Sequence, residues 1–283
     1  MTDLVHFHYI HFINCLPPED SGGAKRIYEN LLNINGFRGP LRTEYTETPT
    51  PTEFLPVLAE IEKNITPNSI PLIHIDAHAD KEYGLSFRND NINKNEYISW
   101  DILTEYLGKI NLKISNKLFL VLCACSAFYI NSKLHPTLAA PFSLCISPYS
   151  ELTLSEIERT IPSFYNSLIK NHDLITAVAA TQESFEMVSS DIFLKEILVK
   201  THMTTLGKAG KLRREGLLTQ LINKSKTPVN KKQARRYIKE RLKSFTDEDI
   251  KRYSDTYLCG RPAPFSAHDV KTEATKRVRA LKT

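Results

Sequence analysis

Two stretches of the chain end in side chains that can do chemistry together. Residues 72–80 (LIHIDAHAD) begin as an apolar run and end in a group of ionisable side chains that includes His78. Residues 118–126 (LFLVLCACS) also begin as an apolar run, and Cys125 is near their end. A thiol becomes a strong nucleophile when a neighbouring imidazole takes its proton or stabilises the thiolate. These residue types therefore predict a cysteine nucleophile paired with a histidine base.

The elements that must position this pair are strands of a parallel sheet. Apolar runs of this length, bounded by polar residues, predict strands covered on both faces. A strand at 4–13, a helix that starts at the N-cap Thr52 and a helix capped by Ser99 alternate with the two stretches, which indicates a parallel sheet. The carboxyl ends of its strands meet at one edge. We therefore predict an α/β fold, a mainly parallel sheet with helices on both faces, with His78 beside Cys125.

Cys123 is the other candidate for the nucleophile. It lies two residues before Cys125, so both side chains would point to the same face of a strand. A free cysteine on a strand is more often a buried core residue than a catalytic one. Because Cys125 comes later in the run, we predict that it is the exposed thiol and the nucleophile.

Less regular segments follow both motifs. Residues 81–96 are polar and lack periodicity, which predicts a loop over the sheet edge that holds His78 and Cys125. Residues 141–146 predict a third strand, and an amphipathic helix is expected after Pro148. Another helix is expected at 174–180.

Composition indicates a cytoplasmic globular protein. The 283 residues are 41% hydrophobic and 24% charged, which is ordinary for soluble proteins. The five cysteines are an odd number without regular spacing, which favours free thiols in a reducing compartment. The N-terminus lacks the pattern of a signal peptide, and no apolar stretch reaches membrane-spanning length.

Positive charge is concentrated in one segment. Residues 200–243 contain 14 Lys and Arg against Glu215 and Glu240, a net charge of +12, so the rest of the chain carries −7. We predict a basic, mostly helical C-terminal extension over 200–283, which docks a partner protein or the acidic body. Clustered cations can also neutralise nucleic-acid phosphates. However, only Tyr237 and Phe245 could stack on bases, so nucleic acid is the less favoured partner.

The two motifs resemble those of caspase-like cysteine peptidases, especially the bacterial CHAT branch. Residues 74–79 (His-Ile-Asp-Ala-His-Ala) stand where that family has His-x-x-Gly-His-Gly, and 122–126 (Leu-Cys-Ala-Cys-Ser) stand where it has Leu-Ser-Ala-Cys-x. Residues 84–87, 98–103 and 146–153 resemble its post-histidine loop and later helices. The resemblance covers roughly residues 5–184 and assigns 1–199 to the peptidase domain.

The resemblance implies a thiol protease that cleaves a protein partner in a bacterial signalling or antiviral defence pathway. Its catalytic residues would be His78 and Cys125, and the backbone N–H groups of Ala79 and Cys125 would form the oxyanion hole. No cofactor or metal is expected at the catalytic step. His74 and Asp76 would pack or orient rather than catalyse.

One departure from the family pattern, next to the predicted catalytic histidine, bears on whether the protein is active. Ala77 and Ala79 replace the glycines on either side of the histidine. Alanine still supplies a backbone N–H, but it excludes backbone angles that glycine adopts. A binding module that kept the fold and lost catalysis is therefore one alternative.

A metal-dependent hydrolase is the other alternative. Asp76, His78 and Asp80 match an Asp-Ala-His-x-Asp segment of arginase-like enzymes, in which oxygen and imidazole ligands bind Mn²⁺ or Zn²⁺. That fold needs further ligands from a second Asp-x-Asp segment at a strand end. The sequence offers residues 247–249 (DED), which fall in the polar extension, so the peptidase is the favoured hypothesis.

Overall fold

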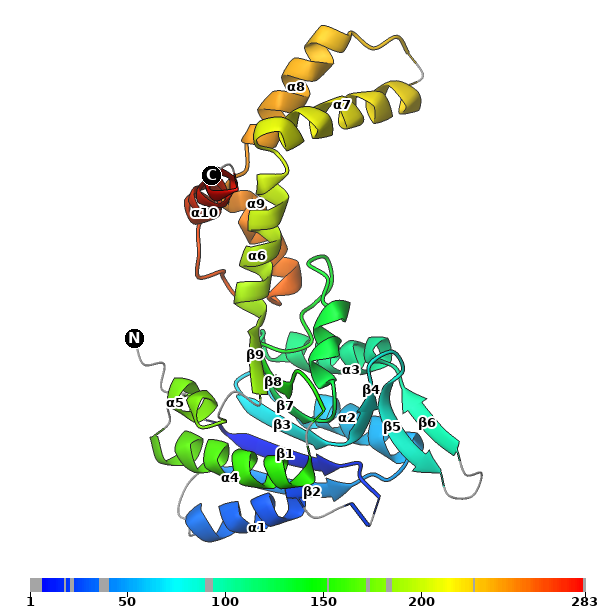
Figure 1. Ribbon diagram of the computed structural model, residues 1–283, viewed down its shortest axis with the longest axis vertical. Helices are drawn as coiled ribbons and strands as arrows, with labels where there is room; N and C mark the ends of the chain where they lie inside the picture. Colours follow the sequence, from blue (N-terminus) through cyan, green and yellow to red (C-terminus); the bar gives the residue numbers. More distant parts are fainter. Residues whose placement is uncertain are drawn as a thin grey trace. The chain divides into compact units, whose positions relative to one another are not determined.

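A six-stranded sheet runs through the first part of the chain in the order β2-β1-β3-β7-β8-β9 (Figure 1). The first five of these strands are parallel, and β9 is antiparallel to β8. The strands are β1 (Tyr9–Asn14), β2 (Arg42–Glu47), β3 (Pro71–Asp76), β7 (Phe119–Cys123), β8 (Leu144–Pro148) and β9 (Phe185–Ser189). The predicted α/β fold with a mainly parallel sheet is confirmed.

The computed structural model describes residues 7–17, 19–20, 23–35, 41–89, 94–151, 153–171, 174–181, 185–225 and 227–281. The chain divides into two units, residues 1–190 and 191–283. The division predicted from the sequence, after residue 199, falls inside helix α6 (Ser190–Met203).

Helices cover both faces of the sheet. On one face, α1 (Gly23–Asn35), α4 (Leu154–Asn171) and α5 (Leu174–Ala179) pack over a core that includes Leu72 and Val121. The other face is covered by α2 (Pro51–Asn64) and α3 (Trp100–Lys113) (Figure 1). Side chains alternate along each strand, so the neighbouring Ile73 and Leu120, both buried, face this second layer.

Helix starts follow local chemistry. Ser99 caps α3 as predicted, and its Oγ accepts the N–H of Ile102 at 3.3 Å. The predicted N-cap Thr52 is wrong by two residues, because α2 is capped at Thr50 and Pro51 occupies the first turn. Proline suits that position since it has no N–H to leave unpaired.

The predicted loop at 81–96 is wrong over residues 84–89 and 94–96, whereas 81–83 form a turn and 90–93 lie outside the described residues. Three antiparallel strands form a small second sheet there: β4 (His78–Asp80), β5 (Gly84–Asn89) and β6 (Lys94–Ile98). Much of β6 is exposed, so its side chains carry no apolar alternation, and pairing through the backbone holds the sheet. Gly84 has φ 101°, and a side chain there would clash with the carbonyl of Ile98.

Strand ends differ from those predicted. β1 starts at Tyr9, and residues 4–6 of the predicted strand lie outside the described residues. The third predicted strand lies at 144–148 rather than 141–146. The run at 118–126 ends as a strand at Cys123, because the next residues form a turn closed by the N–H of Ala127 and the carbonyl of Ala124.

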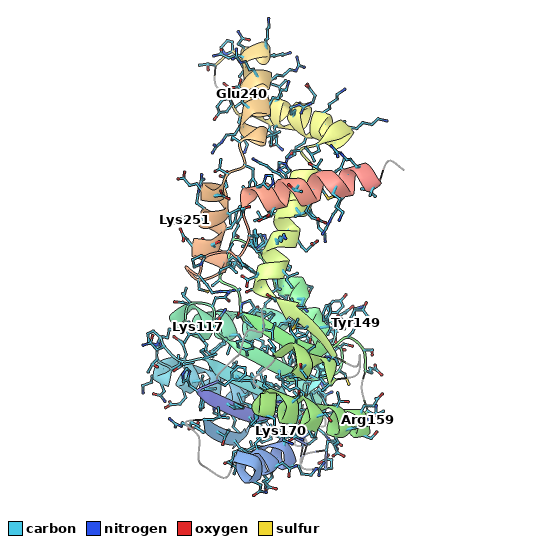
Figure 2. The ribbon with its side chains drawn as sticks, turned by 90° about the vertical axis from the view of Figure 1, so that its left-hand side faces the viewer. Lys117, Tyr149, Arg159, Lys170, Glu240 and Lys251 are labelled. Atoms are coloured by element: carbon cyan, nitrogen blue, oxygen red, sulfur yellow. The ribbon has the colours of Figure 1, made fainter. Side chains whose placement is uncertain are left out.

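The second unit is helical in the part of the chain described. It contains most of α6 and then α7 (Gly207–Lys224), α8 (Lys231–Lys243), α9 (Asp247–Tyr257) and α10 (Ala267–Ala280). α7 and α8 form a hairpin around Leu218, Ala234 and Ile238. Glu240 of α8, which is labelled in Figure 2, is exposed.

Ion pairs join α6 to α10 and to the segment that follows α9. Arg277 contacts both carboxylate oxygens of Glu196 at 2.7 Å, and Arg261 contacts Asp191 at 2.6 Å. A bidentate guanidinium–carboxylate pair is stronger than a single contact. Among the helices described for the whole chain, none is both long and apolar enough to cross a bilayer.

Candidate active site

The sheet register brings the two predicted catalytic residues to the same edge. β3 and β7 are parallel neighbours, and Asp76 lies opposite Cys123 at their carboxyl ends. The ladder continues one step further, because the N–H of Ala77 donates to the carbonyl of Cys123 at 3.1 Å. His78 and Cys125 each follow two residues after this pair, so they leave the sheet at matching positions.

Cys125 lies on a tight turn rather than on the strand. The turn is closed by the hydrogen bond between Ala127 and Ala124, so Cys125 and Ser126 occupy its centre. Ser126 has φ 55°, a left-handed conformation that is uncommon for a residue other than glycine. The N–H of Ser126 also donates to the carbonyl of Ser150 at 3.4 Å, which ties the turn to the end of β8. The Cys125 side chain is half-buried at this edge.

His78 is oriented by a carboxylate that the sequence analysis did not identify. Its Nε2 lies 2.9 Å from Oδ2 of Asp20, which follows β1. A carboxylate can only accept, so Nε2 donates and Nδ1 keeps the lone pair that a base needs. The His78 side chain is 51% exposed, which leaves it accessible to a substrate. The cysteine, the histidine and this carboxylate (Cys125, His78 and Asp20) are named the edge set below.

Further contacts hold the segments of the edge set. Glu19, next to Asp20, pairs with Arg88 of β5 at 2.7 Å, which connects the residues after β1 to the small sheet that carries His78. Lys81 lies over the ring of Tyr129 at 4.7 Å from the ring centre. That cation–π contact joins the segment after His78 to the 3₁₀ helix η1 (Ala127–Lys133), which directly follows the Cys125 turn.

Cys123 is in a different environment. It is 1% exposed, and burial raises the pKa of its thiol well above the ordinary value, with Asp76 adding to the rise. The thiolate is the nucleophilic form, so this cysteine is both shielded and kept protonated. The expectation that Cys125 is the more exposed of the two thiols is confirmed.

His74 and Asp76 lie beside Cys123, inside the protein. Burial lowers the pKa of His74 to about 3 and raises that of Asp76 to about 6, while the N–H of Ala24 and the charge of His78 partly offset the rise at Asp76. His74 Nδ1 is 2.9 Å from the Tyr165 hydroxyl. The buried histidine, aspartate and cysteine (His74, Asp76 and Cys123) are named the inner set below.

The residues of the arginase-like alternative do not converge. Asp76 is buried and accepts the N–H of Ala24 at 3.1 Å, whereas His78 bonds to Asp20. Asp80 accepts the N–H groups of Glu82 and Tyr83 in its own turn. Among the described residues, the metal-ligating groups that cluster are those of the inner set instead.

The two residues of the predicted oxyanion hole are at the same edge. Ala79 lies on β4 opposite Leu85, one residue after His78, and Cys125 lies on its turn. Ala77 is buried and links the two strand ends through the N–H described above. That position is therefore compatible with alanine in this chain.

Asp20 had no signal of its own in the sequence. It stands 58 residues before His78 in a stretch that reads only as a loop after a strand. Its location after β1 was the available clue, because β1 is parallel to β3 and ends at the same edge. No protein-family model matches the chain, and no curated protein matches it either.

Proposed function

We propose that this protein is a caspase-like cysteine endopeptidase with Cys125 as nucleophile and His78 as base. One observation carries the proposal: His78 is hydrogen-bonded to Asp20 at the sheet edge where Cys125 stands on a tight turn. A nucleophile, a base and a group that orients the base are the parts of a covalent catalytic site.

The chemistry follows from these positions. The Cys125 sulfur attacks the carbonyl carbon of the peptide as its proton passes to Nδ1 of His78. The amine leaves with that proton when the C–N bond breaks, and a thioester remains on Cys125. His78 then takes a proton from water, whose oxygen attacks the thioester and releases the acid and the thiol. Asp20 holds the ring in one tautomer throughout.

The developing oxyanion would be held by the backbone N–H groups of Ala79 and Cys125. Both groups belong to the segments that follow β3 and β7 at the same edge of the sheet. Fixed donors of this kind stabilise charge that appears only in the transition state.

Aromatic side chains follow two of the strands at the proposed catalytic edge. Tyr149 follows β8 at the same edge, is 70% exposed and lies at the surface of the first unit (Figure 2). Its ring centre is 5.4 Å from that of Phe128, three residues after Cys125. Exposed aromatic rings beside a reactive group provide apolar contact for a peptide substrate.

The experiment that tests the proposal is digestion of a peptide library. Wild-type protein should cleave a defined subset of sequences, and the Cys125→Ala variant should cleave none. Cys145→Ser is the matched control, because Cys145 is a buried thiol on β8 away from the edge and its loss should leave cleavage intact. Cleavage by the Cys125→Ala variant would contradict the assignment of the nucleophile. No cleavage by either protein would favour a binding module.

The substrate is inferred to be a protein that docks on the basic hairpin α7–α8. Lys and Arg dominate this hairpin, and its two acids, Glu215 and Glu240, are paired with Arg235 and Arg236. The remaining cations are left to attract an acidic partner over about the Debye length, ~8 Å at physiological salt. Higher salt should therefore weaken cleavage of the natural protein target and leave cleavage of a short neutral peptide unchanged.

A further inference from the structure

The inner set brings three types of metal ligand together in the core. One ligand atom from each of His74, Asp76 and Cys123 lies within 4.8 Å of the other two. Asp76 and Cys123 are opposite each other in the β3–β7 register, and His74 is two residues earlier on the same face of β3. All three residues are at most 2% exposed.

One nitrogen of this set has no partner. Nδ1 of His74 is bonded to the Tyr165 hydroxyl, while Nε2 is buried without a hydrogen bond. A buried polar atom without a partner is unfavourable, because it has lost water and gained nothing in exchange. If Nδ1 donates to Tyr165, Nε2 presents a lone pair, which is the arrangement of a metal-binding histidine with its supporting hydrogen bond.

We propose that the inner set binds a zinc ion through the Cys123 sulfur, His74 Nε2 and an Asp76 oxygen, with a water molecule in the fourth tetrahedral position. Thiolate, imidazole and carboxylate are the ligands that zinc takes in proteins. Bonds of ~2.0 to 2.3 Å in a tetrahedral site separate the ligand atoms by roughly 3.3 to 3.8 Å, so the set would close by about 1 Å. Binding replaces the proton of Cys123, and the complex of Zn²⁺ with one thiolate, one carboxylate and a neutral imidazole carries no net charge, as a buried site requires.

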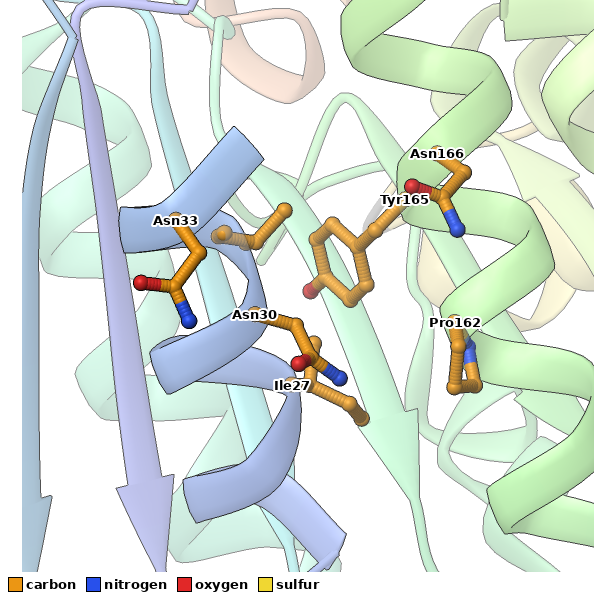
Figure 3. A pocket seen from close by; sticks show the side chains of 7 residues that line it. Ile27, Asn30, Asn33, Pro162, Tyr165 and Asn166 are labelled. Carbon is orange, nitrogen blue, oxygen red and sulfur yellow. The ribbon is translucent and has the colours of Figure 1, made fainter. Parts of the chain in front are cut away.

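Burial of the three ligands fits a metal that stabilises the fold rather than one that meets a substrate. The N–H of Ala24, at the start of α1, holds the Asp76 carboxylate at 3.1 Å, and Tyr165 holds His74 from α4. Tyr165 reaches from α4 toward α1, where it lines a small hollow between the two helices (Figure 3). Zinc would thus join the ends of β3 and β7 to the helices above them, two residues before His78 and Cys125.

Because the ligands are buried, zinc is expected to enter as the chain folds and to leave slowly afterwards. The edge set also contains a cysteine, a histidine and a carboxylate at the surface. Full-length protein with Cys125→Ala is therefore the right background for the test, because it removes the exposed thiol.

The first measurement is the zinc content of this background, produced in zinc-containing medium and purified without chelator. We expect about one zinc ion per chain, since a site whose three ligands are buried releases its metal slowly. After unfolding with chelator, refolding with Zn²⁺ should raise the melting temperature above that of the same protein refolded without metal. Reconstitution with Co²⁺ should produce the absorption band of a thiolate–cobalt bond.

Variants then identify the ligands. Adding Cys123→Ser should abolish the thiolate–cobalt band and lower zinc affinity, whereas adding Cys145→Ser, at a buried thiol on the next strand, should change neither. His74→Ala should also lower zinc affinity. The proposal is overturned if the folded Cys125→Ala protein contains no zinc and refolds with the same melting temperature with and without Zn²⁺. That outcome would leave the peptidase proposal untouched, since no part of this test measures cleavage.

Discussion

The edge set and the inner set contain the same three residue types in opposite environments. His78 and Asp20 are about half exposed and hydrogen-bonded to each other. His74 and Asp76 are buried, with their pKa values shifted toward the neutral forms. Cys125 and Cys123 are only two residues apart, but Cys125 is half-buried whereas Cys123 is buried and its thiol pKa is raised. Distance along the chain is therefore a poor guide to chemical role.

The comparison shows that burial decides whether a cysteine, a histidine and a carboxylate are suited to catalysis or to metal binding. A catalytic thiol must meet a substrate and release a proton to a base, so it needs access and a polar partner. A buried thiol lacks both, but it can bind a metal ion that replaces its proton. The last hydrogen-bonded step between β3 and β7 marks the boundary between the sets, with the inner set before it and Cys125 and His78 after it.

Removing either side chain of the edge set that is proposed to be catalytic should have the largest effect. Cys125→Ala and His78→Ala should each lower kcat/KM by at least ~10³-fold, and by similar amounts, because paired catalytic groups act as a unit. Circular dichroism should show that both variants remain folded, since neither side chain is in the core. A large loss of activity in a folded Cys123→Ala variant, with activity kept in Cys125→Ala, would reverse the roles of the two sets.

Alkylation should separate the thiols in a single experiment. Iodoacetamide should modify Cys125 of the folded protein at least ~10²-fold faster than any other cysteine, because the others are buried and must wait for local opening. Burial also raises the pKa of Cys15 and of Cys145 to about 12. Peptide mass spectrometry measures the rates, and denatured protein, in which all five thiols should react, is the control.

Weakening the orientation of His78 should have an intermediate effect. Asp20→Asn should lower kcat by roughly 10- to 100-fold, because an amide can donate as well as accept and no longer imposes one tautomer on the ring. The labelling of Cys125 by an alkylating agent should persist. Glu19→Gln, one residue away, breaks the ion pair with Arg88 and is the matched control, with a smaller loss expected. Equal activity of wild type and Asp20→Asn would remove Asp20 from the catalytic set.

A third histidine tests the role of burial outside both sets. His11 is buried between Tyr9 and Thr46, and burial lowers its pKa from 6.5 to about 4. The unfolded chain therefore binds the proton more readily between these two pH values, so stability falls as pH drops from 6.5 towards 4. From pH 7 to pH 5 this one group should lower the free energy of unfolding by roughly 1 to 2 kcal/mol.

Denaturant titrations at the two pH values measure this loss, and a His11→Gln variant should lose correspondingly less. If wild type and His11→Gln lose equal stability on acidification, His11 is protonated as readily in the folded protein as in the unfolded chain. Burial would then fail to explain the behaviour of histidines in this sheet.

The smallest expected effect concerns the surface around the edge set. Tyr149→Ala should raise KM for a cleaved peptide about 3- to 10-fold with little change in kcat, because the ring provides apolar contact and no chemistry. Tyr97→Ala is the control, since Tyr97 is an exposed tyrosine on β6 that pairs with Tyr83 instead. A loss in kcat with an unchanged KM would place Tyr149 in the catalytic machinery.

The sequence by itself predicted the features that depend on local pattern. The apolar runs of β3 and β7 were found because strands buried on both faces are continuously hydrophobic. Ser99 was found as a cap because its chemistry acts within three residues. The order of Cys123 and Cys125 along one run was enough to predict which thiol is exposed.

Only the tertiary structure decided the features that depend on distant partners. β2, β6 and β9 lie at the edges of their sheets, and backbone pairing with other strands defines them. β2 and β6 carry mostly polar side chains, and β9 is only five residues long. Asp20 meets His78 across 58 residues, and His74 meets Tyr165 across 91. Neither contact produces a repeating pattern in the sequence. Each joins two segments that are far apart along the chain and whose local patterns are independent of each other. Tertiary packing also buried the inner set in the core and left the edge set at the surface.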